Sequence, residues 1–306
     1  MTRRTILLYH RVARDPGDPY GLCVDPDRFC AQLGVLRDLV DIVPLDDLVA
    51  RPARHGTSRR RSQVALTFDD GYADNLIEAL PALERHDTPI TLFVASGLLG
   101  DPRGFWWDRL ATLLVGRQHV DLDLRRAGVS LRISLHGPRA GSDALVALHS
   151  RLRLLDVAAI DTVLEHVARQ LRAEVPRPHH ARVLWPEELE KMASSPLVTV
   201  GAHTVDHRLL AGLPREDQER TMRSSARVLE ELLDRGVRHF AYPYDDPAAV
   251  DDDSFEAARR CGFATACTTS AGRVTALSDR LRLPRRMVRD WDADTFRSHL
   301  LAWRSI

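Results

Sequence analysis

Two adjacent carboxylates, Asp69 and Asp70, stand directly after an apolar segment and directly before Gly71. The stretch, residues 64–75, reads VALTFDDGYADN. Like charges side by side at the end of a buried strand repel each other and lose hydration, so folding alone gives no reason for the pair. The pattern indicates that a cation compensates their charge.

Two histidines, His203 and His207, form an H-x-x-x-H pattern in VTVGAHTVDHRLL, just beyond another apolar segment. Imidazoles at this spacing can face one point, either across a helical turn or at a loop entering a helix, and neutral imidazole is a favoured zinc ligand. The pair alone is weak evidence in a chain with 13 histidines, where two surface or hydrogen-bonded side chains are the simpler interpretation.

The carboxylates and the histidines are stronger evidence for a metal site together than apart, because both groups follow expected parallel strands. In α/β barrels the carboxyl ends of the strands are where functional side chains gather. One Asp and two His give the three protein ligands of an open catalytic metal site. The remaining carboxylate, close to the metal but outside its coordination shell, has the arrangement expected of a general base.

The elements that would position these residues are apolar, strand-like runs separated by amphipathic helical patterns. The alternation predicts a mostly parallel sheet, open or closed into a barrel. The expected strands cover residues 5–10, 64–70, 90–95, 197–203, 239–244 and 263–269.

Two helical patterns are especially clear. One covers residues 25–39, and the other begins at Pro214 and is expected to stop at Gly236. The apolar positions of the second pattern, which we expect to face the core, are Val228, Leu229, Leu232 and Leu233.

Residues 102–180 break the alternating rhythm. They contain FWWDRL, then polar and Arg-rich segments, then one long helical pattern over residues 144–171. We expect a mainly helical insertion at about 102–180, packed beside the barrel within a single domain of residues 1–306. Trp106 and Trp107 could stack on a sugar, but paired Trp side chains more often pack in a core.

Composition limits the partners and the compartment. Lys plus Arg equals Asp plus Glu at 43 each, so no global field favours nucleic acid or an anionic membrane, and neither is an expected partner. The four cysteines lack C-x-x-C spacing, and the first apolar run is too short for a signal peptide. No segment approaches the length of a transmembrane span, so we expect a cytoplasmic protein with reduced thiols. The oligomeric state is left open.

TFDDGY, HTVDH and a later YPY, in this order, resemble the polysaccharide deacetylase family, also called carbohydrate esterase family 4 or the NodB homology domain. The resemblance extends over residues 67–244 and leaves out the insertion. It implies an α/β fold, a distorted (β/α) barrel of about seven parallel strands. It also implies a metal-dependent hydrolase that removes an N-acetyl group from an amino sugar and releases acetate and a free amine.

The same resemblance assigns roles to individual residues. Asp69 would be the catalytic base, and Asp70 would hold a divalent metal together with His203 and His207. Zinc is the first choice of metal, with cobalt or nickel as alternatives. The backbone N–H of Tyr244, in the third motif, would stabilise the oxyanion of the tetrahedral intermediate.

The third motif departs from the family pattern. Many members carry an arginine just before this motif that orients the catalytic aspartate, whereas Ala241 and Tyr242 stand there in this chain. Arg285 or Arg286, in LRLPRRMVRD, could supply the guanidinium, although either could equally be a surface charge.

The general acid departs from the pattern as well. The usual late L-x-H motif is missing, and His299 falls within a helical pattern. The first expected strand, however, ends in LLYH, and the first and last strands of a closed barrel are neighbours. Biofilm poly-N-acetylglucosamine deacetylases have such a permuted arrangement, so the resemblance makes His10 the candidate acid.

The substrate would be an N-acetylated sugar: a glycan precursor, a lipid- or nucleotide-linked sugar, or an amino-sugar natural-product intermediate. Two alternatives stay open. One is a deformylase or another C–N amide hydrolase on the same site. The other is a non-catalytic glycan-binding barrel, which the missing third-motif arginine favours and which the joint presence of Asp69, Asp70, His203 and His207 opposes. Asp74 and Asn75 are expected to cap the helix that follows them.

Overall fold

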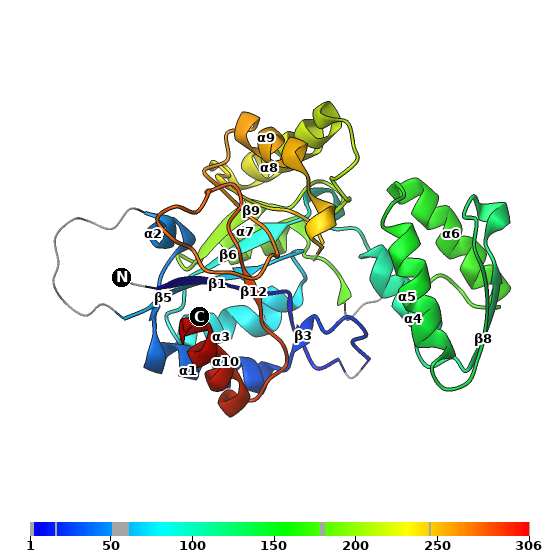
Figure 1. Cartoon of the computed structure of the whole chain (residues 1–306), viewed down its shortest axis with the longest axis horizontal. Coiled ribbons are helices and arrows are strands. Elements are labelled where there is room, and N and C mark those ends of the chain that lie inside the picture. Colours follow the sequence, from blue (N-terminus) through cyan, green and yellow to red (C-terminus); the bar gives the residue numbers. More distant parts are fainter. Residues whose placement is uncertain (1–2, 16, 51–60, 178–180, 245, 306) are drawn as a thin grey trace. The chain divides into compact units, whose positions relative to one another are not determined.

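The computed structural model describes residues 3–15, 17–50, 61–177, 181–244 and 246–305 (Figure 1). The chain folds into two compact units. The first comprises Met1–Pro16, Gly21–Leu99 and Leu184–Ile306, and the second comprises Gly17–Tyr20 and Gly100–Val183.

A parallel sheet forms the centre of the first unit, and its seven-strand path confirms the expected fold class. The order is β11 (Thr265–Cys267), β10 (His239–Ala241), β9 (Val198–Ala202), β6 (Ile90–Val94), β5 (Gln63–Phe68), β1 (Arg4–Tyr9) and β12 (Arg286–Met287). An eighth strand, β4 (Asp41–Ile42), pairs with β5 beside this path. Every expected strand is present, and most of them end before the polar residues of the motifs.

The central strands are buried on both faces. All residues of β1 and of β6 are buried, as continuous apolar runs in a covered parallel sheet should be. In the register of β1 and β5, Tyr9 pairs with Phe68, and the N–H of Asp69 donates to the carbonyl of Tyr9 at 3.0 Å. The two strands therefore end together, with His10 and Asp69 one residue beyond the last pair.

The ends of the sheet curl toward each other through the segment that leads into β12. Leu283 pairs in parallel with Cys267 of β11, and its carbonyl accepts from the Thr268 N–H at 2.8 Å. Three residues later, Arg286 pairs with Leu7 of β1. One short stretch of chain thus connects both edges, which produces the distorted barrel.

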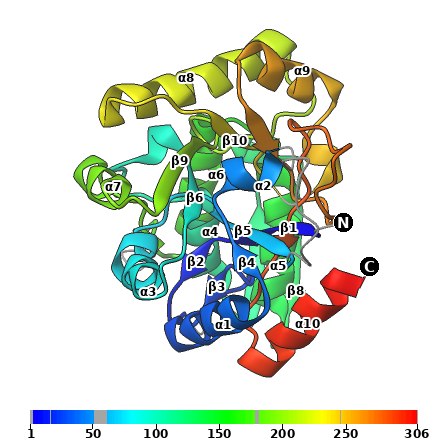
Figure 2. The ribbon, with the colours of Figure 1, turned by 90° about the vertical axis from the view of Figure 1, so that its left-hand side faces the viewer.

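Helices surround the strands of the first unit, and α10 lies beside α1 (Figure 2). The longer ones are α1 (Pro26–Leu39), α3 (Leu80–Arg85), α7 (Pro186–Ala193), α8 (Arg215–Leu233), α9 (Asp252–Arg260) and α10 (Ala293–Ser305). The shorter elements are β2 (Arg11–Val12), β3 (Cys23–Val24), α2 (Leu45–Val49), the π-helical η1 (Asn75–Ala79) and the 3₁₀ turns η2 (Ser96–Leu98) and η5 (Pro247–Ala249).

Helix α8 differs in detail from the expected pattern. It ends at Leu233, because Asp234 takes a left-handed conformation with φ of 49°, two residues before Gly236. Val228 is 42% exposed rather than in the core, while Leu229 is buried. The buried row of this helix is partly polar and consists of Gln218, Thr221, Met222, Ser225 and Leu229.

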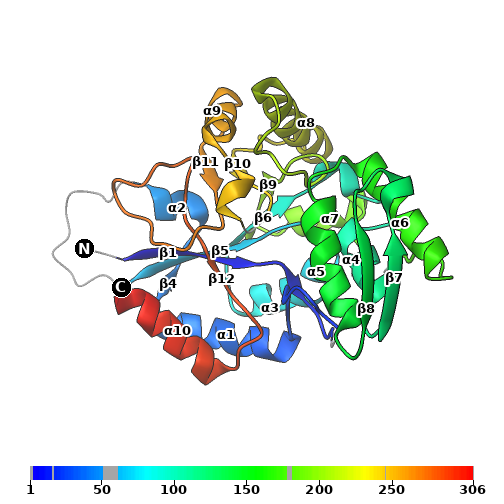
Figure 3. The same cartoon turned by 45° about the vertical axis from the view of Figure 1, so that its right-hand side comes forward.

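The second unit is mainly helical but contains an unexpected hairpin (Figure 3). Its elements are α4 (Trp106–Leu114), the antiparallel pair β7 (His119–Asp123) and β8 (Arg132–His136), the 3₁₀ turn η3 (Arg125–Ala127), α5 (Ala140–Leu152) and α6 (Val157–Gln170). The expectation of one helical pattern over residues 144–171 is wrong. Asp156 caps a new helix by accepting from the Ala159 N–H at 2.8 Å, which separates α5 from α6.

Trp106 and Trp107 are buried in the second unit, as expected for core side chains. The interpretation of this unit as an insertion within one domain stays a prediction. All four cysteines are free thiols. Among the described residues, no helix combines the length and the apolar character that crossing a membrane requires.

Candidate active site

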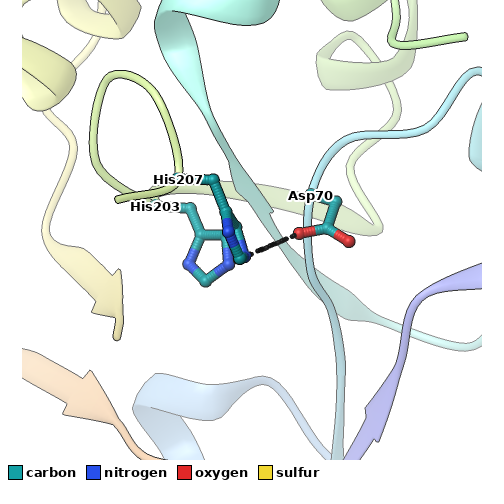
Figure 4. A group of neighbouring side chains, drawn as sticks. All are labelled: Asp70, His203 and His207. Carbon is teal, nitrogen blue, oxygen red and sulfur yellow. Dashed lines mark ion pairs between the residues drawn. The ribbon is translucent and has the colours of Figure 1, made fainter. Parts of the chain in front are cut away.

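Three side chains from distant parts of the sequence converge as the spacing of the motifs predicted. One ligand atom each from Asp70, His203 and His207 lies within 4.8 Å of the other two. Asp70 Oδ1 is 3.5 Å from His203 Nε2 and 3.4 Å from His207 Nε2, and both rings face this oxygen in Figure 4. All three residues are buried.

Hydrogen bonding shows which atoms are left to bind a cation. His203 Nδ1 is 2.8 Å from the carbonyl oxygen of Ala241, and because a carbonyl can only accept, Nδ1 carries the hydrogen. In the neutral ring, Nε2 then presents its lone pair toward Asp70. Asp70 Oδ1 is itself buried and accepts no hydrogen bond from the part of the chain that the structure describes. When His203 is neutral, its Nε2 lone pair and Asp70 Oδ1 therefore face each other as two potential metal ligands.

The spacing of the donors suits a small divalent ion. Zinc binds His nitrogen and carboxylate oxygen at about 2.0–2.1 Å, which in a tetrahedral site places ligand atoms about 3.3 Å apart. The two Oδ1–Nε2 distances of 3.5 and 3.4 Å are close to this value. The residues present thus fit the metal that the motifs imply.

The charges of the cluster also favour a bound cation. Burial tends to raise the pKa of Asp70, but the nearby histidines outweigh it and lower that pKa to about 2. Burial tends to lower the pKa of His203, but Asp69 and Asp70 outweigh it and raise that pKa. Asp70 is therefore ionised, and its charge and that of Asp69 favour a positive charge at the imidazoles.

Strand ends and unusual backbone conformations position these ligands. Asp69 and Asp70 follow β5, His203 follows β9, and both strands pair with β6 between them. Positive φ angles cluster here: 78° at Asp70, 60° at Thr204, 53° at His207 and 69° at Tyr244. Residues other than glycine rarely adopt such angles, and their concentration is typical of functional sites.

Gly71 has a physical reason to follow the two carboxylates. Its φ is 81°, and an added Cβ would lie 3.1 Å from Cγ1 of Val94 on β6. A glycine satisfies both the turn and the close approach to the neighbouring strand.

Asp69 is paired with Arg285, the first of the two arginines that the sequence left open. Arg285 Nη1 and Nη2 donate to the two carboxylate oxygens of Asp69, each at 2.6 Å. The guanidinium is fully buried, and its Nε also donates to the carbonyl of Thr268 at 3.0 Å. Arg286, in contrast, places its guanidinium 5.3 Å from the ring centre of Trp303.

The ion pair decides the ionisation of Asp69. Burial tends to raise the pKa of this carboxyl, but the charge of Arg285 outweighs burial and lowers it. Asp69 Oδ2 remains 4.0 Å from His203 Nε2, farther than Asp70 is. The two adjacent carboxylates therefore have different partners, one a guanidinium and the other the imidazoles.

His10 directly follows β1, and its electrostatic neighbours are the groups of this site. Burial lowers the pKa of His10, while Asp70 and Asp69 act in the opposite direction. Its lowered pKa means that the imidazole is mostly neutral at pH 7 before substrate and metal bind. The structure thus gathers His10 with the residues that the motifs predicted.

Tyr244 lies beyond β10 on the same side of the sheet. Its ring meets the His207 ring edge-on, with centroids 4.7 Å apart, and its carbonyl accepts from Thr269 Oγ1 at 3.2 Å. The third motif is therefore next to a predicted metal ligand. Its N–H as an oxyanion donor stays a prediction.

Comparison with protein families gives a match to the polysaccharide deacetylase model over residues 56–131 and 147–266, more than half of the chain. The chain belongs to the polysaccharide deacetylase family. The match contains Asp69, Asp70, His203 and His207, and the break in it, residues 132–146, falls within the second unit.

Solved structures with the same fold support the assignment of the barrel. IcaB from Ammonifex degensii has 20% identity and a TM-score of 0.63, covering 100% of this chain and 98% of its own. The Streptococcus pyogenes deacetylase PplD in complex with acetate has 18% identity and a TM-score of 0.62, covering 99% and 98%. A de-N-acetylase from Aggregatibacter actinomycetemcomitans has 15% identity and a TM-score of 0.59, covering 97% and 99%. No curated protein sequence matches the chain.

In this polysaccharide deacetylase family member, one expectation near the motifs is wrong. Asp74 and Asn75 do not cap η1 with their side chains. Asp74 instead binds Arg11, and Asn75 binds the carbonyl of His10. The signal in the sequence was a charged residue on each side: Arg11 directly after the candidate acid, and Asp74 in the loop of the candidate base.

Proposed function

We propose that this protein is a metal-dependent hydrolase that removes the acetyl group from an N-acetylated amino sugar and releases acetate and a free amine. The observation that carries the proposal is the division between two adjacent carboxylates. Asp70 faces His203 and His207, while Asp69 is held ionised by Arg285 and outside that cluster. Family membership supplies the reaction class.

Each residue of the site has a distinct task in this reaction. Asp70, His203 and His207 would hold the ion, zinc first and cobalt or nickel as alternatives. When bound, such an ion polarises the amide carbonyl and makes water easier to deprotonate. Asp69 accepts a proton from the attacking water, and Arg285 keeps its carboxylate oriented and charged.

The remaining steps use His10 and Tyr244. The N–H of Tyr244 would donate to the oxyanion as the carbonyl carbon becomes tetrahedral. His10 would take up a proton from solvent and give it to the nitrogen as the C–N bond breaks, because an unprotonated amide nitrogen is a poor leaving group. The proton that Asp69 accepted returns to solvent, so the protons balance. Water thus adds across the amide bond, and the products are acetate and an amine.

The substrates that we propose are a glycan precursor, a lipid- or nucleotide-linked sugar, or an amino-sugar natural-product intermediate, met in the cytoplasm. Cell fractionation tests the location: we expect the protein with cytoplasmic markers, and its recovery from the medium or the envelope would refute this part.

The test of activity is incubation of the purified protein with zinc, cobalt or nickel and a panel of N-acetylated and N-formylated amino sugars. We expect metal-dependent release of acetate, measured enzymatically, and about 10²–10⁴-fold slower release by the Asp69→Asn variant. Release of formate alone would make the protein a deformylase. Tight sugar binding with no release of either acid would make it a glycan-binding barrel. That alternative rested on the missing third-motif arginine, and Arg285 now pairs with Asp69.

A further inference from the structure

The three residues that follow β1 are held by two consecutive side chains from the loop after β5. Asn75 Nδ2 donates to the carbonyl of His10 at 2.8 Å. Asp74 Oδ2 accepts from Arg11 Nε at 2.9 Å, and its Oδ1 accepts from the Val12 N–H at 3.2 Å. We call Arg11, Asp74 and Asn75 the His10 clamp.

The clamp is buried and specific in its geometry. Arg11 is 3% exposed, Asp74 is 8% exposed and Asn75 is fully buried. Asn75 Nδ2 also lies 3.2 Å from Asp74 Oδ1, and Arg11 also donates to Asp15 at 3.1 Å. Buried ion pairs rarely add more stability than well-packed apolar side chains would, so stability alone is a weak reason for them.

The clamp connects the proposed base, Asp69, with the proposed acid, His10. Asp69, the proposed base, begins the same loop that carries Asp74 and Asn75, and its N–H donates to Tyr9, the residue before His10. The backbone of His10 is therefore fixed relative to Asp69 by hydrogen bonds on both sides.

We propose that Asp74 and Asn75 are positioning residues that hold His10 in place to protonate the leaving nitrogen. The inference rests on the proposed function. A general acid acts only within hydrogen-bond reach of the atom that it protonates, so a small displacement of the His10 backbone removes much of its effect. The contact of Asn75 with His10 is made through the backbone carbonyl of His10.

The test compares two substrates that differ in their need for an acid. An N-acetylated sugar releases an amine that must be protonated, whereas 4-nitrophenyl acetate releases a phenolate that leaves without a proton. Both are measured with the zinc-loaded wild type and the Asn75→Ala, His10→Ala and Asn75→Ala/His10→Ala variants. Asp74→Asn is a second clamp variant, and Gln218→Ala is the matched control. Gln218 is a fully buried amide that donates to the carbonyl of Leu213 at 3.0 Å.

We expect Asn75→Ala to lower kcat for the amide at least tenfold, within the about 10²–10⁴-fold range of general acid catalysis, and to change ester hydrolysis less than threefold. His10→Ala should show the same selective loss, and the double variant should add little to it. Gln218→Ala should leave the ratio of the two activities unchanged.

Equal losses on both substrates, losses that multiply in the double variant, or full amide activity in Asn75→Ala and Asp74→Asn would each overturn the clamp. The proposed function would then still stand, because the wild type would release acetate from the N-acetylated sugar. A wild type that hydrolyses the ester but releases no acetate from any N-acetylated sugar would overturn the proposed function and the clamp together.

Discussion

Asp69 and Asp70 are neighbours in sequence, yet they have different partners. The guanidinium of Arg285 donates to both oxygens of Asp69 at 2.6 Å, while Oδ1 of Asp70 faces two imidazole nitrogens. A carboxylate beside a fixed cation stays ionised, and one that faces lone pairs is suited to bind a metal. Identical side chains thus obtain different roles from their environment.

Substitutions at these positions should separate metal binding from turnover. We expect Asp69→Asn to keep its metal and to lose about 10²–10⁴-fold in kcat, because the base is lost and the ligands remain. We expect His203→Ala to lose the metal. Metal content after dialysis and acetate release measure both effects, and equal metal content in the two variants would contradict this division.

The acid limb of the pH–rate profile should depend on Arg285. Asp69 acts as a base only when ionised, so kcat/KM falls as the pH drops through its pKa. Arg285 lowers that pKa, and Arg285→Lys loses the two-point contact, so the pKa rises and the fall in rate occurs at higher pH. Arg286→Lys is the control and should leave the limb in place; an unshifted limb in Arg285→Lys would refute the pairing.

Residue types and spacing predicted one aspartate and two histidines as metal ligands and the other aspartate as the base, and the resemblance to the family assigned these two roles to Asp70 and Asp69. They could not choose between Arg285 and Arg286. That choice depends on which side chain turns into the barrel, and only the pairing of β12 with β1 determines it. They also gave the wrong task to Asp74, whose partner, Arg11, is 63 residues away in the sequence.

At the scale of elements, the carboxyl ends of the strands position the residues of the site. The strands were predictable because parallel strands covered on both faces are continuous apolar runs. The hairpin of β7 and β8 was missed, although β7 alternates as a half-buried strand does, with Val120 and Leu122 buried and Asp121 between them exposed. On α8, Leu229 is buried and Leu232 and Leu233 pack against the core as expected, whereas Val228 is exposed. The buried polar residues Gln218, Thr221 and Ser225 were not predicted.

Gly201 gives a test of how closely β9 must pack to place His203, two residues later. A Cβ at Gly201 would lie 2.6 Å from Cδ1 of Phe93 and 3.0 Å from the carbonyl oxygen of His239. We expect Gly201→Ala to destabilise the protein by about 1–3 kcal/mol and to weaken zinc binding, because β9 has to shift. Urea unfolding and zinc titration measure the two effects.

Gly34 is the matched control, since it lies in α1 and an added Cβ would meet nothing within 4 Å. Gly34→Ala should stabilise the protein by about 1 kcal/mol and leave zinc affinity unchanged. Similar zinc affinity in the Gly201→Ala variant and the wild type would show that the position of His203 does not depend on this packing.

At the scale of the whole molecule, metal binding should contribute to stability. The ligands come from the loops after β5 and β9, which an unfolded chain does not bring together. Zinc at 100 times its dissociation constant should therefore add about 2.7 kcal/mol to the free energy of unfolding. Thermal unfolding with zinc and with a chelator measures this difference. His203→Ala should show almost none, and an equal response of both proteins would mean that the metal binds elsewhere.

The alternation of elements along the chain predicted a mostly parallel sheet, and the resemblance to the family implied about seven strands in a distorted barrel. The division into two units did not, because Gly17–Tyr20 belongs with Gly100–Val183 although about 80 residues separate them. Local patterns carry no information about such distant associations.

Arg285 comes from the short stretch that joins β11 to β1, so the proton affinity of Asp69 reports whether the ring of strands is shut. Loss of the pairing between β12 and β1 would remove Arg285 from Asp69 and stop hydrolysis, while the metal ligands after β5 and β9 stayed in place. The pairing that closes the barrel therefore also keeps the catalytic carboxylate charged.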